Sequence, residues 1–150
     1  ITILYSKTEA ITMLRTSLIP YLLSNLESSA NQTMPLKIFE IGRVFSLDKI
    51  EVKENLNLSF VCEHSKANFA EIKANVEALI KLMNNKNYEI IEEKNNSFID
   101  GRCAAIYINN NKFGIFGEIH PQVLKNFNIN EPVIACELVI KKNIKYDYKI

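Results

Sequence analysis

Apolar residues recur at helical spacing in two segments of the chain. The first runs from about Pro20 to Ser29, and its apolar face comprises Ile19, Leu22, Leu23, Leu26 and Ala30. The second begins after Asn68, and its face comprises Phe69, Ile72, Val76, Leu79, Ile80 and Met83. This spacing predicts two amphipathic helices packed on a core. Pro20 suits a first helical turn, and Asn68 with Glu71 three residues later predicts a reciprocal N-terminal cap.

Shorter apolar runs bounded by turn signals predict strands. We expect them over residues 1–5, 37–47, 56–63, 88–93, 104–108, 112–119 and 132–140. A charged loop over residues 48–55 is expected to join two of them as an antiparallel hairpin, and Asp100-Gly101 is expected to form a turn. His120-Pro121 predicts the start of a short helix that ends near Phe127. Dominant strands with interspersed helices predict an α+β fold, a mostly antiparallel sheet flanked by helices.

Length and composition fit one globular domain over residues 1–150, with a tail over residues 141–150. The chain is 47% hydrophobic and 23% charged, and its formal net charge is +1. So weak a net charge gives no argument for binding to nucleic acid or to a membrane. No apolar run is long enough to span a bilayer, and no signal peptide is recognisable. Because the chain starts with Ile1 inside a predicted strand, we expect a segment excised from a longer protein.

The three cysteines Cys62, Cys103 and Cys136 are widely spaced, and each lies within an apolar run. Buried thiols in a reduced, cytoplasmic protein are the expected state. A metal centre would need clustered ligands, and His64 is the one candidate ligand next to Cys62, with nothing to complete the set. We therefore expect no metal site in this domain.

Charged residues inside apolar strand runs are the candidates for a site. Glu40, Glu118 and Glu137 each interrupt such a run. A buried glutamate must be paired or must shift its pKa. The interpretation favoured for all three is a strand face turned toward solvent or toward a partner.

The chain has three arginines, and each lies in a motif-like position: Arg15, Arg43 and Arg102. Arginine forms fixed bidentate bonds, so these positions predict specific ion pairs. His120 precedes a proline and is interpreted as a helix-entry residue rather than as a catalytic one. Lysines and tyrosines in the tail over residues 141–149 could contact RNA, but a solvated tail is favoured.

Several motifs, in order, resemble one family. They occupy residues 14–20, 38–45, 69–79, 101–102 and 115–124, and together they resemble the β subunit of phenylalanyl-tRNA synthetase over residues 1–140. The resemblance is to the archaeal and eukaryotic type, because the chain ends soon after its last strand. It implies a fold like that of class II aminoacyl-tRNA synthetases. It also implies an α subunit as partner, in an (αβ)₂ heterotetramer that uses ATP and magnesium to attach phenylalanine to tRNA(Phe).

The chain departs from active class II modules at two ATP contacts. In those modules the strand corresponding to residues 42–45 continues with an arginine that holds the α-phosphate, whereas this chain has Ser46. Their last strand is rich in glycine and is followed by an arginine, whereas this chain has Glu137, Val139 and Lys142. The resemblance therefore implies a non-catalytic core module without catalytic, cofactor-binding or metal-binding residues of its own.

Further departures leave other interpretations open. The family usually has Asn-Pro near Tyr5, and Ala105 stands where glutamate is common. One alternative is an active ligase domain, against which Ser46 and Lys142 argue. Another is a free-standing synthetase-like protein that senses a ligand or binds RNA. In the favoured interpretation Arg43 has a structural role, paired with Glu40 or across a subunit interface.

Overall fold

A single sheet organises the part of the chain that the computed structural model describes, residues 13–49, 51–83 and 87–141. Its six strands are β1 (Leu36–Asp48), β2 (Glu51–Glu63), β3 (Tyr88–Glu92), β4 (Phe98–Ile108), β5 (Asn111–Ile119) and β6 (Val133–Lys141). Their order across the sheet is β1-β2-β6-β5-β4-β3, and all neighbours are antiparallel. The predicted α+β class is confirmed. The strand expected over residues 1–5 and the tail from residue 142 lie outside the described residues.

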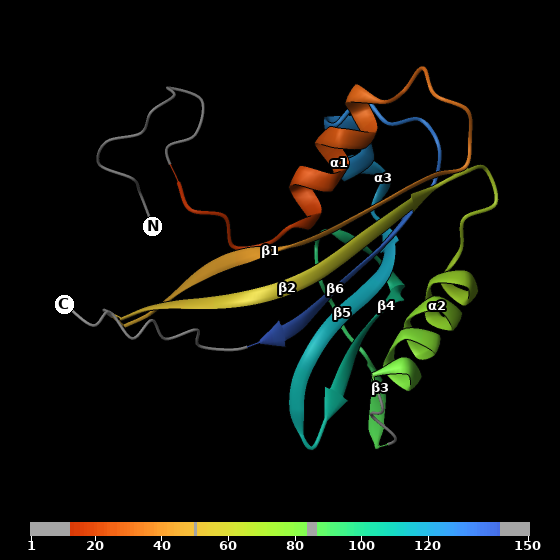
Figure 1. Ribbon diagram of the computed structural model, residues 1–150. Coiled ribbons are helices and arrows are strands. Elements are labelled where there is room, and N and C mark those ends of the chain that lie inside the picture. The colour runs from red at the N-terminus through yellow and green to blue at the C-terminus, as the bar shows by residue number, and fades with distance from the viewer. Residues whose placement is uncertain (1–12, 50, 84–86, 142–150) are drawn as a thin grey trace.

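Three helices cover the two faces of this sheet (Figure 1). They are α1 (Ile19–Ser28), α2 (Phe69–Leu82) and α3 (Pro121–Asn126). Helices α1 and α3 pack on one face and α2 packs on the other, so the sheet has a hydrophobic core on each side. Ala30 was expected on the apolar face of α1, but it lies beyond the end of the helix and is exposed. None of the helices in the described ranges is long and apolar enough to cross a membrane.

The hairpin of β1 and β2 is longer than the sequence pattern predicts. Asp48 pairs with Glu51, so the charged loop expected over residues 48–55 is wrong and most of it is strand. The charges of this segment pair with one another across the hairpin. Lys53 contacts Asp48, and Arg43 Nε lies 3.1 Å from Glu54 Oε1. Cross-strand ion pairs of this kind let an exposed ribbon carry many charged residues.

The turn predicted at Asp100-Gly101 is also wrong, because both residues lie inside β4. The pairing of β4 with β5 shifts register between Phe98 and Cys103, and Gly101 has a φ of 74°. Glycine adopts this left-handed conformation without steric cost, so the residue forms an irregularity in the strand rather than a reversal of the chain.

The predicted cap of α2 is confirmed in part. The side chain of Asn68 accepts a hydrogen bond from the main-chain N–H of Glu71 at 3.1 Å. The reciprocal bond expected from the Glu71 carboxylate does not form, because Glu71 Oε2 instead lies 2.9 Å from His64 Nε2. His120 is confirmed as a helix-entry residue, since its Nδ1 accepts the N–H of Gln122 at the start of α3.

Candidate functional site

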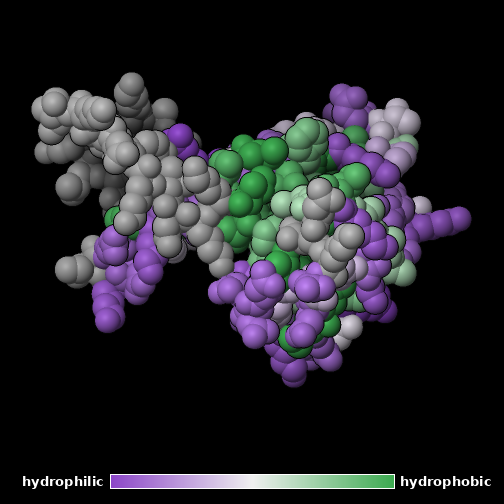
Figure 2. All heavy atoms as spheres, turned by 60° about the horizontal axis from the view of Figure 1, so that its bottom comes forward, coloured by the Kyte–Doolittle hydropathy of each residue, from purple (hydrophilic) through white to green (hydrophobic). Residues whose placement is uncertain are grey.

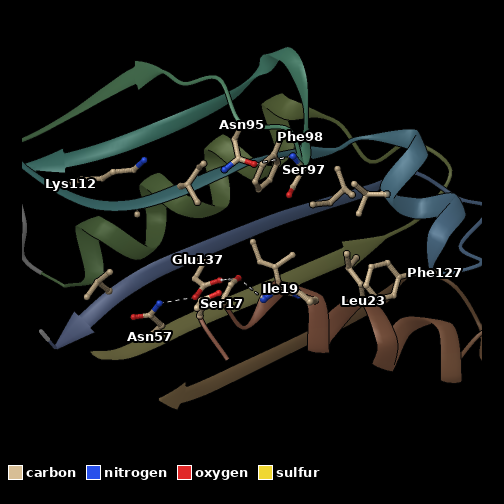
Figure 3. Close-up of a pocket in the computed structure, with 17 residues that line it drawn as sticks. Ser17, Ile19, Leu23, Asn57, Asn95, Ser97, Phe98, Lys112, Phe127 and Glu137 are labelled. Atoms are coloured by element: carbon tan, nitrogen blue, oxygen red, sulfur yellow. Dashed lines mark hydrogen bonds between the residues drawn. The ribbon is translucent and has the colours of Figure 1, made fainter. Parts of the chain in front are cut away.

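Glu137 lies on β6 with only 7% of its surface exposed, and its carboxylate meets the N-terminus of α1. The main-chain N–H of Leu18 donates to both of its oxygens, at 3.2 and 3.0 Å. The Ser17 hydroxyl donates at 2.5 Å, and Asn57 Nδ2 of β2 donates at 2.7 Å (Figure 3). The expectation that Glu137 faces solvent or a partner is therefore wrong. The carboxylate is buried because four hydrogen bonds from neutral donors replace its water.

Glu118 on β5 occupies the corresponding position on the other face of the sheet. It is 8% exposed, and its Oε1 accepts the N–H of Phe69, the first residue of α2, at 2.7 Å. Its Oε2 lies 2.7 Å from Arg102 Nη1. The solvent-facing interpretation is wrong for Glu118 too, whereas the expected ion pair of Arg102 is present. On each face of the sheet, a buried glutamate of a strand thus accepts a main-chain N–H at the start of one helix.

Arg15 connects the segment before α1 to the edge strand β1. Its Nη1 lies 2.7 Å from Glu40 Oε1, and its Nε donates to the main-chain oxygen of Arg43 at 2.8 Å. Its guanidinium also lies 5.4 Å from the centre of the Tyr21 ring. Glu40 therefore pairs with Arg15, and the expected pairing of Arg43 with Glu40 is wrong, because Arg43 pairs with Glu54. Whether these residues also act across a subunit interface stays a prediction.

A group of possible metal ligands forms where the sequence suggested none. Cys62, His64 and Glu71 bring their ligand atoms within 4.8 Å of one another, so Glu71 of α2 adds the ligand that seemed to be missing. His64 Nδ1 accepts the N–H of Lys66 at 3.3 Å, so its Nε2 carries the proton and donates to Glu71. Burial raises the pKa of the Cys62 thiol, and nearby Glu71 raises it further. Within this group a hydrogen bond joins His64 to Glu71, and the Cys62 thiol lies beside that pair.

All three cysteines are buried free thiols, as predicted. Burial raises the pKa of each thiol, to about 11 for Cys103 and well above its usual value for Cys136. They belong to the core rather than to a reactive site, because the thiolate is the reactive form of cysteine.

A pocket of about 580 Å³ opens beside Glu137, between α1, α3 and the sheet (Figure 3). Its polar wall comes from Thr16, Ser17, Asn57, Asn95, Ser97, Lys112 and Glu137. Its apolar wall comes from residues of α1, α3 and the sheet, namely Ile19, Pro20, Leu23, Phe98, Ile115, Ile119, Val123, Phe127 and Val139, and Gly114 completes the lining. A concave, mainly apolar site with a few polar groups is typical of small-molecule binding.

Exposed hydrophobic side chains gather on the outer strands. On β1, the side chains of Phe39, Ile41 and Leu47 are 70%, 55% and 60% exposed. They alternate along the strand, so they share one face, and Phe39 and Ile41 are paired with Phe60 and Leu58 of β2. We call Phe39, Ile41, Leu47, Leu58 and Phe60 the outer band. Figure 2 shows hydrophobic residues gathered on part of the face that it draws.

The positions that would hold a nucleotide in an active class II module carry unsuitable residues. Ser46 near the end of β1 is exposed and is paired with Lys53 in the hairpin. At the expected glycine position of β6, the carboxylate of Glu137 lies on the sheet surface, where it would repel phosphate. The described residues therefore do not fit ATP. Lys142, the other substituted position, lies outside them.

A comparison with models of protein families shows which family this chain belongs to. Residues 1–140 match the model of the phenylalanyl-tRNA synthetase β chain CLM domain. The chain belongs to this family. The resemblance predicted from the motifs is thereby confirmed.

Curated β subunits are similar over most of the chain. The phenylalanine–tRNA ligase β subunit of Archaeoglobus fulgidus is 39% identical over 127 residues, which is 85% of this chain and 22% of the relative. That of Methanococcus aeolicus is 39% identical over 135 residues, 86% of this chain and 24% of the relative. The chain thus spans less than a quarter of the length of these relatives. Both are archaeal, in agreement with the type predicted from the sequence.

Solved structures support the fold of this β-chain domain. Pyrrolysyl-tRNA synthetase from Desulfitobacterium hafniense superposes with a TM-score of 0.69, covering 84% of this chain and 47% of that one. The identity is 14%, so the likeness concerns the fold alone. The predicted class II synthetase-like architecture is confirmed.

Sequence reasoning named Glu137 but interpreted it as facing solvent or a partner, and it left Ser17 and Asn57 out of the candidate residues. One signal could have found them. The residue before α1 is Leu18, which has no side-chain acceptor, and Pro20 follows in the first turn. A helix start without a local cap needs an acceptor from elsewhere, and a glutamate inside an apolar strand is the kind of residue that provides one.

Proposed function

We propose that this chain is a non-catalytic core domain, over residues 1–150, of a phenylalanine–tRNA ligase β subunit. In this role it supports the α subunit, which attaches phenylalanine to tRNA(Phe) with ATP and magnesium. Membership of the β-chain family and the large uncovered length of its relatives support the role of a part within a larger enzyme. Three buried free thiols are in keeping with a reducing cytoplasm.

The observation that carries the non-catalytic role is the position of Glu137. Its carboxylate is held on the sheet by Ser17, Leu18 and Asn57, so it cannot turn away to admit a nucleotide without leaving buried donors unpaired. A buried negative charge also opposes the triphosphate of ATP. ATP and magnesium are therefore assigned to the whole enzyme and not to these residues.

The outer band is the surface that we assign to the α subunit. Phe39 and Ile41 expose large apolar side chains on β1, the first strand in the order of the sheet. Exposed apolar groups that gather on one face mark interaction surfaces in many proteins. The Arg15–Glu40 pair lies at the same strand and fixes its conformation.

Two measurements test this function. The purified 150-residue chain should give no phenylalanine-dependent exchange between ATP and pyrophosphate, whereas the chain co-expressed with the α subunit should copurify with it. Because the chain spans less than a quarter of its relatives' length, the capture is also run with the preceding segment of the β subunit fused ahead of Ile1. Exchange activity of the chain alone, or no capture in either form, would overturn the proposal.

Matched variants locate the contact. Phe39→Asp and Ile41→Asp should each abolish capture of the α subunit, because a charge in an apolar contact loses its hydration. Leu82→Asp is the control, since Leu82 is 81% exposed at the end of α2, away from the outer band. Equal capture by all three variants would remove the outer band from the interface. A free-standing synthetase-like protein would show no capture at all.

A further inference from the structure

We infer that the pocket beside Glu137 binds a small amphipathic amine, meaning a molecule with one ammonium group on an apolar body. The inference goes beyond the support of an α subunit and does not depend on it. It rests on three properties of the described pocket: a negative charge without an ion-pair partner, an unpaired acceptor, and an apolar wall of suitable size.

The charge comes from Glu137. Its hydrogen-bond donors are a hydroxyl, a main-chain N–H and an amide, all of them neutral. Among the described residues no cation lies within ion-pair distance of its carboxylate. Lys112 also lines the pocket, but its Nζ lies 2.8 Å from Glu93 Oε1, which balances its charge. Glu137 therefore has no ion-pair partner among the described residues, and a full positive charge would stabilise its buried carboxylate further.

The unpaired acceptor is the side-chain oxygen of Asn57. Asn57 Nδ2 must face the acceptor-only carboxylate of Glu137, so Oδ1 points away from it (Figure 3). Asn57 is only 5% exposed, and its Oδ1 has no hydrogen-bond partner among the described residues. A buried acceptor without a donor is unfavourable, because it has given up its hydrogen bonds to water. An ammonium group supplies several N–H donors and no acceptor, so it matches the charge of Glu137, and it can donate to Asn57 Oδ1 once a small shift of that amide uncovers the enclosed oxygen.

The apolar wall determines the size and shape of the apolar part of the ligand. Phe98, Phe127, Ile115 and Val123 line the side of the pocket that faces α3. A volume of about 580 Å³ lies within the range of ordinary small-molecule pockets, roughly 300–1,000 Å³. An apolar body of one ring or one branched chain fits this wall. Phosphorylated or carboxylated ligands are excluded by the negative charge.

A series of three probes of similar shape tests the inference on the unmodified chain. They are 2-phenylethylamine, which is cationic, 2-phenylethanol, which is neutral, and 3-phenylpropanoate, which is anionic. Binding is followed by titration of the amide signals of the ¹⁵N-labelled protein. The amine should bind in a saturable way, shifting the Asn57 side-chain amide and the Gly114 N–H, about tenfold more tightly than the alcohol. The anion should not bind.

Several results would overturn the inference. They are equal affinity of the amine and the alcohol, shifts confined to other regions, and no saturable binding of the amine up to about 10 mM, where an interaction is too weak to be specific.

Variants give a second, independent test. Glu137→Gln keeps the shape and removes the charge, so it should abolish the preference for the amine over the alcohol. Ile115→Trp fills the pocket from the sheet and should abolish binding of both. Glu89→Gln changes an exposed residue of β3 and should bind the amine as the unmodified chain does.

If Glu137→Gln does not fold, the probe series and Ile115→Trp still test the inference. Amine binding without α-subunit capture would contradict only the proposed function, and capture without amine binding would contradict only this inference.

Discussion

The main-chain N–H of Leu18 donates to both carboxylate oxygens of Glu137, across 119 positions of sequence. Leu18 is the residue before α1 and has no side-chain acceptor for the free N–H groups of the helix. Ser17 Oγ accepts the N–H of Ile19 at 3.2 Å, and Pro20 has no N–H. Because a helix N-terminus carries a partial positive charge, the carboxylate of β6 both completes the cap and is stabilised by it. One strand residue thereby fixes how α1 lies on the sheet.

Removing this carboxylate should destabilise the fold strongly. Glu137→Ala leaves Leu18 N–H, the Ser17 hydroxyl and the Asn57 amide without an acceptor inside the protein. We expect the free energy of unfolding to fall by about 2–4 kcal/mol, from unpaired buried donors and a lost cap. Equilibrium unfolding in urea, followed by circular dichroism, measures the change.

The control for this prediction is Glu89→Ala on β3, where the side chain is exposed. It should change the free energy of unfolding by no more than about 0.5 kcal/mol, as surface substitutions usually do. Glu137→Gln, which keeps one acceptor, should lie between the two. A loss for Glu137→Ala as small as that for Glu89→Ala would show that the cap at α1 contributes nothing.

The ion pair of Arg102 and Glu118 should stabilise the folded state measurably, but by less than a fully buried ion pair would. The side chain of Glu118 is 10% exposed, whereas that of Arg102 is 58% exposed, so water screens part of the attraction. A double-mutant cycle with Arg102→Met and Glu118→Gln should give a coupling energy of about 1 kcal/mol. The matched control is the pair Lys94–Asp100, 3.7 Å apart with both side chains mostly exposed, whose coupling should be near zero. Equal couplings for the two pairs would contradict the prediction.

Local signals predicted most of the elements of this fold. The stripes after Pro20 and Asn68 are helices, and the alternating runs are strands in an antiparallel sheet. These signals work because periodicity records which face of an element is buried. They failed at Asp100-Gly101, since the same dipeptide serves a tight turn and a strand irregularity, and only pairing with β5 distinguishes them.

The candidate site was harder to predict, for a reason seen at β2. In β2 the apolar residues Leu58 and Phe60 are half-buried, whereas the polar residues Asn57 and Ser59 on the opposite face are more deeply buried. Ser59 donates to the main-chain oxygen of Cys136 and Asn57 donates to Glu137, both about eighty positions away. Polar residues are buried where distant partners satisfy them, and a single sequence does not reveal those partners.

Glu63 should be a site where a substitution stabilises the protein at neutral pH. It is 5% exposed, and its Oε2 has no hydrogen-bond partner among the described residues. Burial raises the pKa of this carboxyl, and the negative charge of Glu131 raises it further. A raised pKa in the folded state means that stability is fully present below the unfolded pKa and falls as pH rises through the folded value.

Glu63→Gln removes this titration. At pH 7 we expect the free energy of unfolding to rise by roughly 1 kcal/mol, because the neutral amide removes the negative charge that burial and Glu131 disfavour. At pH 4 the native carboxyl is protonated, so the gain should disappear. Urea unfolding at the two pH values measures the difference, and Glu92→Gln, at an exposed position of β3, is the control. A gain that is the same at both pH values would show that ionisation of Glu63 is not its source.

The buried thiol of Cys103 predicts a loss of stability in alkali. Burial raises its pKa to about 11, Glu93 adds to the rise, and Lys112 opposes it. Its usual pKa is 9.0, so between pH 9 and about pH 11 the unfolded chain loses a proton that the folded chain keeps. The free energy of unfolding should therefore fall over this range, by roughly 1–2 kcal/mol from this thiol. Cys103→Ala should show a smaller fall between pH 8 and pH 10.5 in urea unfolding, whatever its stability at pH 8. An identical fall in the two proteins would assign the alkaline loss to other groups.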